Sequence, residues 1–397
     1  MPESDPSNTP QSVSQSVYMP TPGSAAPSGN APDMRTLLEL AVARGASDLH
    51  LMSNLPPMLR IHGQLATSDF PPLARDDVKR LIYGLLTDRH KTQFERELEL
   101  DISIGLQGVG RFRVNVHLQR GSVEAAFRLV PPTIPKLEEL GLPPVVSELA
   151  RRQTGLVLVT GPTGVGKTTT LAAMVDLIST ERQALIITIE DPIEFLYHHK
   201  KSVVKQREVH ADTKSFASAL VHALRQDPNV IVVGEMRDLE TISTALTAAE
   251  TGHLVLATLH TPDAPQTVDR ILDVFPPYQQ EQVKIQFADC LQGIVSQQLL
   301  PRIDKPGRVV ACEVMIATPA VRNLVREHAT NQLLTVIQTG AQYGMCTMDS
   351  SIKDLLQKEI IDADTALSRA KHPEEIMALI QQQQAKQKKS LFGHHKK

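Results

Sequence analysis

Eight residues from Gly161 to Thr168 match the spacing G-x-x-x-x-G-K-[ST], the pattern in this chain that most directly indicates chemistry. Glycines at these positions let the backbone curl so that its N–H groups point inward at a polyphosphate, and the start of the following helix adds positive potential. Lys167 can reach the β- and γ-phosphates of a nucleotide, and the Thr168 hydroxyl can ligate Mg²⁺. We therefore predict a nucleotide-binding loop with contacts from Gly161, Pro162, Thr163, Gly164, Val165, Gly166, Lys167, Thr168 and Thr169.

The segments around this loop have the patterns needed to position it. The apolar run Leu156–Val159 before the loop indicates a buried parallel strand, and Thr169–Ile178 after it indicates a helix. Further apolar runs at 184–189, 230–233 and 254–259 alternate with helical patterns. This alternation is typical of an α/β fold, in which helices cover both faces of a parallel sheet.

Carboxylates follow two of these strands, and hydrolysis needs carboxylates to hold Mg²⁺ and to orient water. Ile231–Glu235 is an apolar strand that ends in an acid, with Gly234 where many P-loop enzymes place an aspartate. Glu190, Asp191 and Glu194 follow another strand. Because like charges gathered at a sheet edge are costly unless a cation binds there, we predict a metal site rather than a solvated acidic loop. Its expected ligands are Thr168, Asp191 and Glu235.

Two histidines, His253 and His260, flank the strand 254–259 at its two ends. An extended chain of this length spans roughly 23 Å, so both histidines cannot contact one phosphate if the strand is straight. We expect one of them to sense the γ-phosphate and the other to order a neighbouring loop. A structural role is the alternative for each.

Composition excludes several classes of protein. The formal net charge of -3 argues against a dedicated nucleic-acid binder. The three cysteines form no C-x-x-C pair, which excludes a zinc ribbon. No apolar run approaches the ~20 residues of a membrane span, and the N-terminus lacks the features of a secretory signal. We therefore expect a cytoplasmic protein with reduced thiols.

Periodicity and composition divide the chain into five parts. A leader rich in proline and serine should be disordered, and an α+β domain with strands at 111–119 and 123–130 should follow it. The later α/β domain should contain a long helix over 278–299 and a strand over 308–316. The predicted boundaries are 1–32 for the leader, 33–130 for the first domain, 131–144 for an interdomain linker, 145–375 for the α/β domain with its helical C-terminal part, and 376–397 for a flexible basic tail.

Four segments together resemble the motifs of the secretion ATPase superfamily. They are 161–168 (Walker A), 189–195 (Asp box), 233–238 (Walker B) and 249–261 (His box). The similarity is greatest to the type IV pilus retraction ATPases, because 319–327 resembles their A-I-R-N-L-I-R-E motif and 268–276 their segment after the His box. The likeness covers about residues 34–360, and it implies a RecA-like P-loop ATPase domain preceded by a PAS-like N-terminal domain.

The resemblance also implies roles for individual residues. Glu190 is implied as the base or water-positioning group and Glu235 as the organiser of the metal, with ATP and Mg²⁺ bound at the loop. N-terminal arginines of this family reach the phosphates of a neighbouring subunit, and Arg113, Arg120 and Arg128 resemble them; a solvated strand face is the alternative. The implied catalytic set is Glu190, Glu235, His260, His253, Arg113, Arg128 and Arg120.

The implied function is that of a homohexameric ATPase that powers pilus retraction from the inner face of the cell membrane. Its expected partners are an inner-membrane pilus platform protein and a PilU-like paralogue, with no nucleic acid. The alternatives are an accessory PilU-like ATPase, a pilus extension or type II secretion ATPase, and a nucleotide-dependent regulatory scaffold. The chain lacks the longer N-terminal region and four-cysteine insertion usual in extension and type II secretion ATPases.

Overall fold

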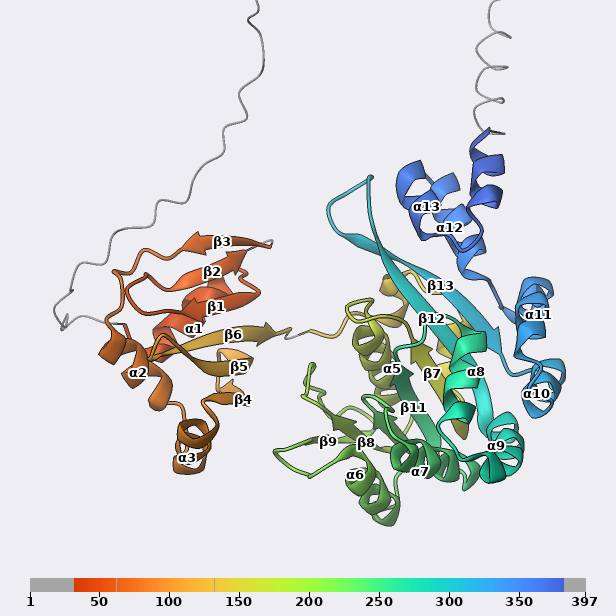
Figure 1. The fold of residues 1–397 in the computed structure, drawn as a ribbon, viewed down its shortest axis with the longest axis horizontal. Helices are drawn as coiled ribbons and strands as arrows, with labels where there is room; N and C mark the ends of the chain where they lie inside the picture. The colour runs from red at the N-terminus through yellow and green to blue at the C-terminus, as the bar shows by residue number, and fades with distance from the viewer. Residues whose placement is uncertain (1–31, 62, 132, 382–397) are drawn as a thin grey trace, which may run out of the picture. The chain divides into compact units, whose positions relative to one another are not determined.

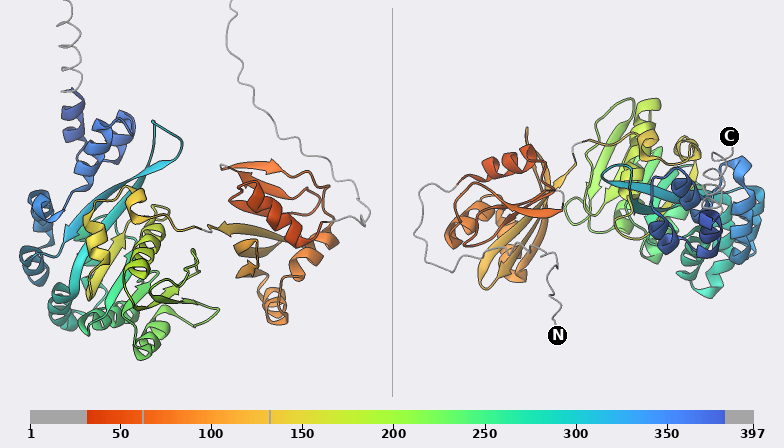
Figure 2. Two further views of the ribbon diagram at one scale, coloured as in Figure 1. Left: turned by 180° about the vertical axis from the view of Figure 1, so that it is seen from behind. Right: turned by 90° about the horizontal axis from the view of Figure 1, so that it is seen from above.

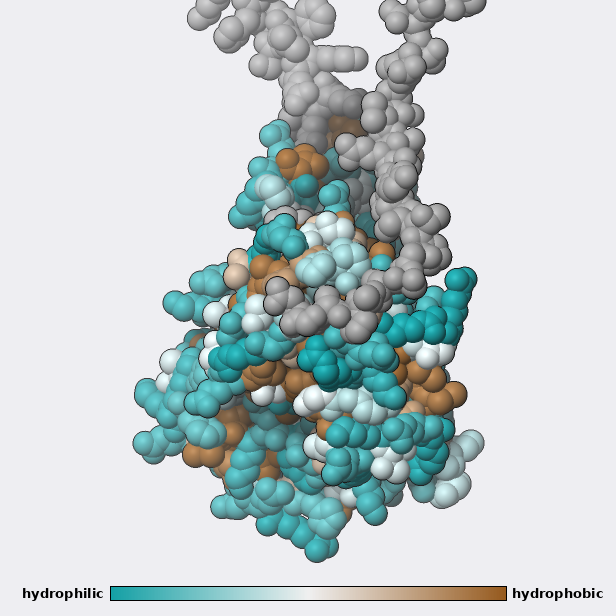
Figure 3. Space-filling model, turned by 90° about the vertical axis from the view of Figure 1, so that its left-hand side faces the viewer, coloured by the Kyte–Doolittle hydropathy of each residue, from teal (hydrophilic) through white to brown (hydrophobic). Residues whose placement is uncertain are grey.

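The computed structural model describes residues 32–61, 63–131 and 133–381, which form two compact units that divide between Val130 and Pro131 (Figure 1). Most of the predicted leader and the end of the predicted tail lie outside the described residues. Within the described ranges, no helix is both long and apolar enough to cross a bilayer. Hydrophilic residues cover most of the face shown in Figure 3, with hydrophobic residues scattered among them.

The first unit is an antiparallel sheet with helices on one face. The six strands lie in the order β3-β2-β1-β6-β5-β4. Its elements are α1 (Met34–Ala43), β1 (Asp48–Leu51), β2 (Met58–Ile61), β3 (Gln64–Thr67), α2 (Arg75–Tyr83), α3 (Asp88–Glu97), β4 (Glu99–Leu106), β5 (Gly110–Gln119) and β6 (Ser122–Val130). The α+β prediction for this part of the chain is confirmed.

Local sequence accounts for the ends of several of these elements. Asp33 caps α1 by accepting a hydrogen bond from the Thr36 amide at 2.7 Å. The β5–β6 hairpin turns at Arg120 and Gly121, whose φ angles of 49° and 76° are those of a tight two-residue hairpin turn. Alternate residues of the strands, such as Phe112 and Phe127, are buried with α1 and α2 in one core. The opposite face of the sheet carries polar side chains.

The second unit is a three-layer α/β structure. Its sheet has seven strands in the order β13-β12-β7-β11-β10-β8-β9, parallel except for the β12–β13 pair. The strands are β7 (Gly155–Thr160), β8 (Leu185–Glu190), β9 (Val203–Glu208), β10 (Val230–Val233), β11 (Leu254–Leu259), β12 (Leu291–Pro301) and β13 (Arg308–Ile316).

Helices cover both faces of this sheet, and the views of Figures 1 and 2 show them on its two sides. One core packs α4 (Val145–Ala150) and α5 (Lys167–Glu181) on one face. A second core packs on the opposite face α6 (Phe216–Ala223), α7 (Leu239–Glu250), α8 (Ala264–Asp273), α9 (Pro277–Cys290), α10 (Pro319–Arg326) and α11 (Leu333–Thr339). The predicted α/β class is confirmed.

A third, smaller core joins the β12–β13 hairpin to the C-terminal helices α12 (Met348–Gln357) and α13 (Ala363–Arg369). Leu300 and Ala311 supply the strand side of this core, and Ile352 and Ile376 are buried against them. The boundary predicted for the flexible tail at residue 376 therefore falls inside packed structure. The chain is helical up to residue 381.

The long helix predicted over 278–299 is wrong in its second half. The helix ends at Cys290, and Leu291 begins β12, which lies between β7 and β13. Apolar residues at 291, 294, 295 and 299 have helical spacing, but a central strand that is buried on both faces carries apolar residues without strict alternation. Gly293 fits this strand, because a Cβ there would lie 2.9 Å from both Leu149 Cδ2 and the Met315 carbonyl oxygen.

The segment predicted as a linker, 131–144, includes structure that belongs to the second unit. A short 3₁₀ helix spans Leu137–Leu140, and Leu137 is buried in the core beneath α4 and α5. Burial of this leucine leaves only residues 131–136 between β6 and the first anchored element of the second unit.

Candidate active site

The nucleotide-binding loop predicted from the sequence connects β7 to α5. Gly164 and Gly166 have φ angles of 81° and 91°, in the left-handed region that favours glycine. Gly161 has φ 133°, and a Cβ there would lie only 2.5 Å from the Gln297 carbonyl oxygen of β12. The loop therefore passes so close to the neighbouring strand that a side chain has no room at its first position.

The lysine of this loop begins α5 and folds back over the loop. Its ammonium donates to the carbonyl oxygens of Gly161 at 2.7 Å and Pro162 at 3.0 Å. Burial lowers the pKa of Lys167, and the negative charges of Glu235 and Glu194 partly offset that effect. The lysine thus lies within electrostatic range of two carboxylates, and its ammonium is held by groups that a phosphate can replace.

Glu235 lies just beyond β10, and its carboxylate contacts the side chains of Arg237 and His260. Arg237 donates to its two oxygens at 2.6 and 2.7 Å, and His260 Nε2 lies 3.0 Å from Oε1. Burial alone would raise the pKa of Glu235, but these hydrogen bonds outweigh it, and the net pKa is below the usual value. The carboxyl group is therefore ionised throughout the physiological range.

Glu190 ends β8 and has the opposite character. Its side chain is buried, and Oε1 accepts hydrogen bonds from the Thr188 hydroxyl at 2.6 Å and from Gln206 Nε2 at 3.0 Å. Burial raises the pKa of this carboxyl, and the hydrogen bonds only partly counter it. The pKa of Glu190 is thus raised and the pKa of Glu235 is lowered, although the two residues follow neighbouring strands.

The parallel register brings these groups to one edge of the sheet. Val233 of β10 is paired with Ile189 of β8 and with Ala257 of β11, so the residues that follow these strands share the carboxyl end of the sheet. The tight packing also explains Gly234, because a Cβ there would lie 3.1 Å from the Ile189 carbonyl oxygen. An aspartate at this position would require β8 and β10 to move apart.

The other predicted metal ligands lie on the same edge. Thr168 is in the first turn of α5, and Asp191 directly follows Glu190 and is exposed. Among the described residues, no three His, Cys, Asp or Glu side chains are grouped so that they could hold a metal ion by themselves. The Thr168 hydroxyl and the carboxylates of Asp191 and Glu235 are oxygen donors, the type of ligand that Mg²⁺ prefers.

The two histidines predicted for the site are separated. His260 contacts Glu235, whereas His253 is at the other end of β11, where its carbonyl oxygen accepts a hydrogen bond from the Gly155 amide at the start of β7. The His253 ring nitrogen Nδ1 lies 3.0 Å from the Ala248 carbonyl oxygen. Within this unit His253 therefore orders the end of α7, and His260, which contacts Glu235, remains the candidate for the predicted γ-phosphate sensor.

Two of the three predicted arginines lie together on the polar face of the first unit. Arg113 of β5 is directly paired with Arg128 of β6, which is paired in turn with Asp48 of β1. Arg128 Nε donates to the Asp48 carboxylate at 2.9 Å. Arg120 is in the hairpin turn, seven residues from Arg113 along the strand, or roughly 23 Å. The structure therefore groups Arg113 with Arg128 and separates Arg120 from both.

Sequence reasoning missed several side chains that support the site. Arg237 neutralises Glu235, and Gln206 of β9 holds Glu190. Gln297 of β12 donates to the Thr170 hydroxyl of α5 at 2.8 Å and braces the helix behind the loop. Arg237 is within the Walker B segment, two residues after Glu235, so its pairing with that carboxylate could have been predicted from the sequence. Gln206 and Gln297 come from strands that the sequence analysis did not identify.

Comparisons with known proteins agree with this geometry. The model of the family described as "Type II/IV secretion system protein" matches residues 30–392. The chain is 49% identical over 342 residues to the "Type IV pilus retractation ATPase PilT" of Pseudomonas aeruginosa, covering 86% of this chain and 99% of the relative. It is 37% identical to the "Type IV pilus ATPase PilU" of the same organism, covering 88% of this chain and 91% of that one.

A solved structure shows the same fold. The structure described as "Crystal Structure of the Pilus Retraction Motor PilT and Bound ADP" matches with a TM-score of 0.82 and 48% sequence identity, covering 87% of this chain and 99% of that chain. The α/β core with its phosphate-binding loop and the preceding antiparallel unit are therefore those of a nucleotide-using enzyme. The chain belongs to the type II/IV secretion system protein family, as an ATPase of its pilus retraction branch.

Proposed function

We propose that this ATPase works as a homohexameric ring in the cytoplasm, at the inner face of the cell membrane, where it powers the withdrawal of type IV pili. The observation that carries the proposal is that Glu190 and Glu235 lie at the carboxyl edge of the sheet that carries the phosphate-binding loop, with pKa values shifted in opposite directions. A protein that only binds a nucleotide has no use for such a pair, whereas a hydrolase needs both a base and a fixed charge.

The two carboxyl groups suit different steps. Glu190 has a raised pKa, which brings it closer to the operating pH of a general base, so it takes the proton of the attacking water. Glu235 stays ionised beside Lys167 and organises the charge around the β- and γ-phosphates. Mg²⁺, when bound through the Thr168 hydroxyl and the phosphates, neutralises the charge that develops on the phosphate oxygens. His260, in contact with Glu235, responds to the presence or loss of the γ-phosphate.

The arginines of the first unit complete the site in an adjoining subunit. Arg113 and Arg128 are the candidates, because they are directly paired on the polar face of the sheet, where Arg128 is exposed and Arg113 is half-buried. An arginine supplied across a subunit boundary contributes on the order of 10³–10⁵ in rate, or about 4–7 kcal/mol. Turnover then changes the angle between the units about residues 131–136, since Leu137 is already anchored in the second unit.

A complementation experiment tests the shared site. Lys167→Ala subunits lack a working loop, and Arg113→Ala subunits lack the arginine, so each variant alone should be inactive. In equimolar mixed rings, a site is active when an intact loop meets an intact arginine, and activity should recover to about a quarter of wild type. Arg120→Ala, in the hairpin turn, is the matched control and should keep its activity alone. Mixtures that stay inactive would show that the arginine acts within its own subunit.

The retraction role is tested in the host cell. Deletion of the gene should give cells with excess pili and no twitching motility, and the Lys167→Ala gene should not restore motility. The higher identity to PilT than to PilU favours the main retraction enzyme over the accessory paralogue. We propose the inner-membrane pilus platform protein and a PilU-like paralogue as its partners. Normal pili with normal motility would refute retraction and leave the ATPase assignment intact.

A further inference from the structure

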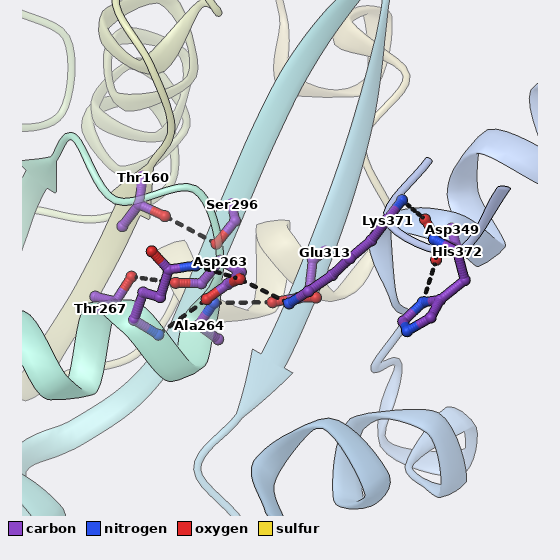
Figure 4. A network of polar contacts seen from close by, with 10 residues as sticks. Thr160, Asp263, Ala264, Thr267, Ser296, Glu313, Asp349, Lys371 and His372 are labelled. Atoms are coloured by element: carbon purple, nitrogen blue, oxygen red, sulfur yellow. Dashed lines mark hydrogen bonds and ion pairs between the residues drawn. The ribbon is translucent and has the colours of Figure 1, made fainter. Parts of the chain in front are cut away.

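A polar cluster of three buried carboxylates, an exposed lysine and a half-buried histidine joins the start of α8 to the C-terminal part of the described chain (Figure 4). We call it the Lys371 cluster; it consists of Asp263, Glu313, Asp349, Lys371 and His372. Asp263 is three residues beyond His260, and Glu313 is on β13. The cluster is outside the set of residues that bind or hydrolyse the nucleotide in the proposed mechanism.

The start of α8 is fixed by two buried carboxylates. Asp263 caps the helix by accepting from the Gln266 amide at 2.9 Å, and its carbonyl oxygen accepts from the Thr267 hydroxyl at 2.6 Å. Glu313 accepts from the Ala264 amide at 2.8 Å. The segment between His260 and α8 therefore has little freedom once Asp263 and Ala264 are held.

These two carboxylates share one cation. Asp263 and Glu313 are 7% and 2% exposed, and the charge of Asp263 disfavours ionisation of Glu313. Lys371 Nζ donates to Asp263 Oδ2 at 2.8 Å and its charge also acts on Glu313. Without this ammonium, two buried acids would face each other at the end of one helix, which is strongly unfavourable.

Lys371 is itself positioned by the C-terminal helices. Asp349, in the first turn of α12, accepts hydrogen bonds from the Lys371 amide at 2.7 Å and from the His372 amide at 3.0 Å. His372 Nδ1 lies 2.8 Å from the same carboxylate. The lysine thus extends from a segment that α12 holds in place, and Figure 4 shows it reaching toward Asp263.

The cluster also connects to the strand that leads into the phosphate-binding loop. Thr160 of β7 is paired with Ser296 of β12, and Ser296 is paired with Glu313 of β13. The Thr160 and Ser296 hydroxyls are hydrogen-bonded at 2.8 Å. Paired residues share a face of the sheet, so Glu313 lies in the same row as the residue directly before Gly161.

We propose that Lys371 is a positioning residue for hydrolysis: its ammonium, placed by the C-terminal helices, neutralises Asp263 and Glu313, and this fixes the start of α8 and holds His260 against Glu235. The inference rests on the role proposed above for His260. Through this contact, the C-terminal helices sense the state of the nucleotide site. Loss of the ammonium shifts His260 and slows turnover while nucleotide binding at the loop is retained.

The experiment compares purified full-length variants. Lys371→Met removes the charge, and kcat should fall roughly 10- to 100-fold, as expected for a misplaced active-site group. The Kd for ADP, measured by direct titration, should stay close to wild type. Lys371→Arg should keep most of the rate. The matched control is Lys353→Met, which breaks an ion pair with Glu375 near the surface of α12 and should change little.

A second substitution separates positioning from packing. Glu313→Gln keeps the oxygen that accepts from Ala264 and removes one acid, so Lys371→Met/Glu313→Gln should recover most of the lost rate. Failure of this rescue would show that Lys371 acts by packing alone and would overturn the inference. If Lys371→Met does not fold, the double variant carries the test: a folded, active double variant supports the inference, and an unfolded one overturns it.

The His260→Ala variant distinguishes this inference from the proposed function. If His260→Ala lowers kcat and Lys371→Met does not, the positioning role is wrong and the role of His260 stands. If His260→Ala leaves kcat unchanged, the role of His260 and the inference both fail. The expected result is that His260→Ala and Lys371→Met lose kcat equally, and that adding Glu313→Gln to Lys371→Met restores most of its rate.

Discussion

Replacing Gly161 by alanine should disrupt the phosphate-binding loop from its β12 side, without removing any side chain that is predicted to contact nucleotide. The new Cβ would lie 2.5 Å from the Gln297 carbonyl oxygen, about 0.9 Å closer than the 3.4 Å at which ordinary contact begins, and 2.9 Å from Val165 Cγ2. The backbone φ of 133° is also one that a side chain disfavours by about 1–3 kcal/mol. Overpacking against a strand backbone adds about 1–3 kcal/mol.

Gly164→Ala is the matched control for this variant. It has a φ of 81°, and a Cβ there would meet nothing within 4 Å, so only the backbone cost of about 1–2 kcal/mol applies. The free energy of unfolding should therefore differ between the two variants by roughly 2.5 kcal/mol at the midpoints of these ranges, which corresponds to roughly 5–10 °C in Tm for a unit of this size.

Thermal unfolding of the nucleotide-free variants measures this difference in stability. Titration with ADP measures how tightly the loop binds nucleotide. Gly161→Ala should also weaken ADP binding, because β12 must move and Gln297 then releases Thr170. Equal melting temperatures for the two alanine variants would refute the close approach of β12 to the loop. A lower Tm with unchanged ADP affinity would show that the loop does not depend on that strand.

Three further variants address the proposed chemistry. Glu190→Gln should abolish phosphate release and remove part of the pH dependence of stability. A buried acid with a raised pKa stabilises the fold below its unfolded pKa, and this contribution is lost as the pH rises through the folded pKa. The variant should therefore have a higher Tm than wild type at pH 8 but not at pH 4. An unchanged Tm difference across that range would refute the burial argument. Arg237→Ala should raise the pKa of Glu235 and shift the acidic limb of the kcat profile upward; an unshifted limb would show that Arg237 does not control that carboxyl. Arg113→Ala should lower steady-state turnover by about 10³-fold or more in assembled rings, whereas Arg120→Ala should stay within about 3-fold; equal losses would contradict the grouping of arginines seen here.

The elements predicted best from the sequence are those whose amino-acid pattern is determined by residues close together in the chain. The loop at 161–168 has a fixed spacing because phosphate binding requires it, and the strands around it are continuous apolar runs because both faces are buried. The two strands of the β5–β6 hairpin were predicted at 111–119 and 123–130, within one residue of their bounds in the structure. Each of these predictions needed only a few neighbouring residues.

The missed elements depend on distant parts of the chain. β12 is a strand because β7 and β13 lie on either side of it, and its apolar spacing alone also fits a helix. β9 is an edge strand with only partial apolar character. β4 is a different case, since Leu100, Ile102, Ile104 and Leu106 alternate clearly and the signal was overlooked. The ion pair of Arg237 with Glu235 was also within reach, because the two residues are close in sequence.

The order of strands in the larger sheet has a consequence for synthesis of the protein. The first unit pairs strands that are near in sequence or joined within about 100 residues, so it can fold as soon as it leaves the ribosome. β7, by contrast, needs β11 and β12 as neighbours, and the second of these ends at Pro301. Until Pro301 has been translated, the apolar strand β7 lacks β12 as its hydrogen-bonded neighbour on one side. A chain that stalls earlier exposes this strand to chaperones and proteases.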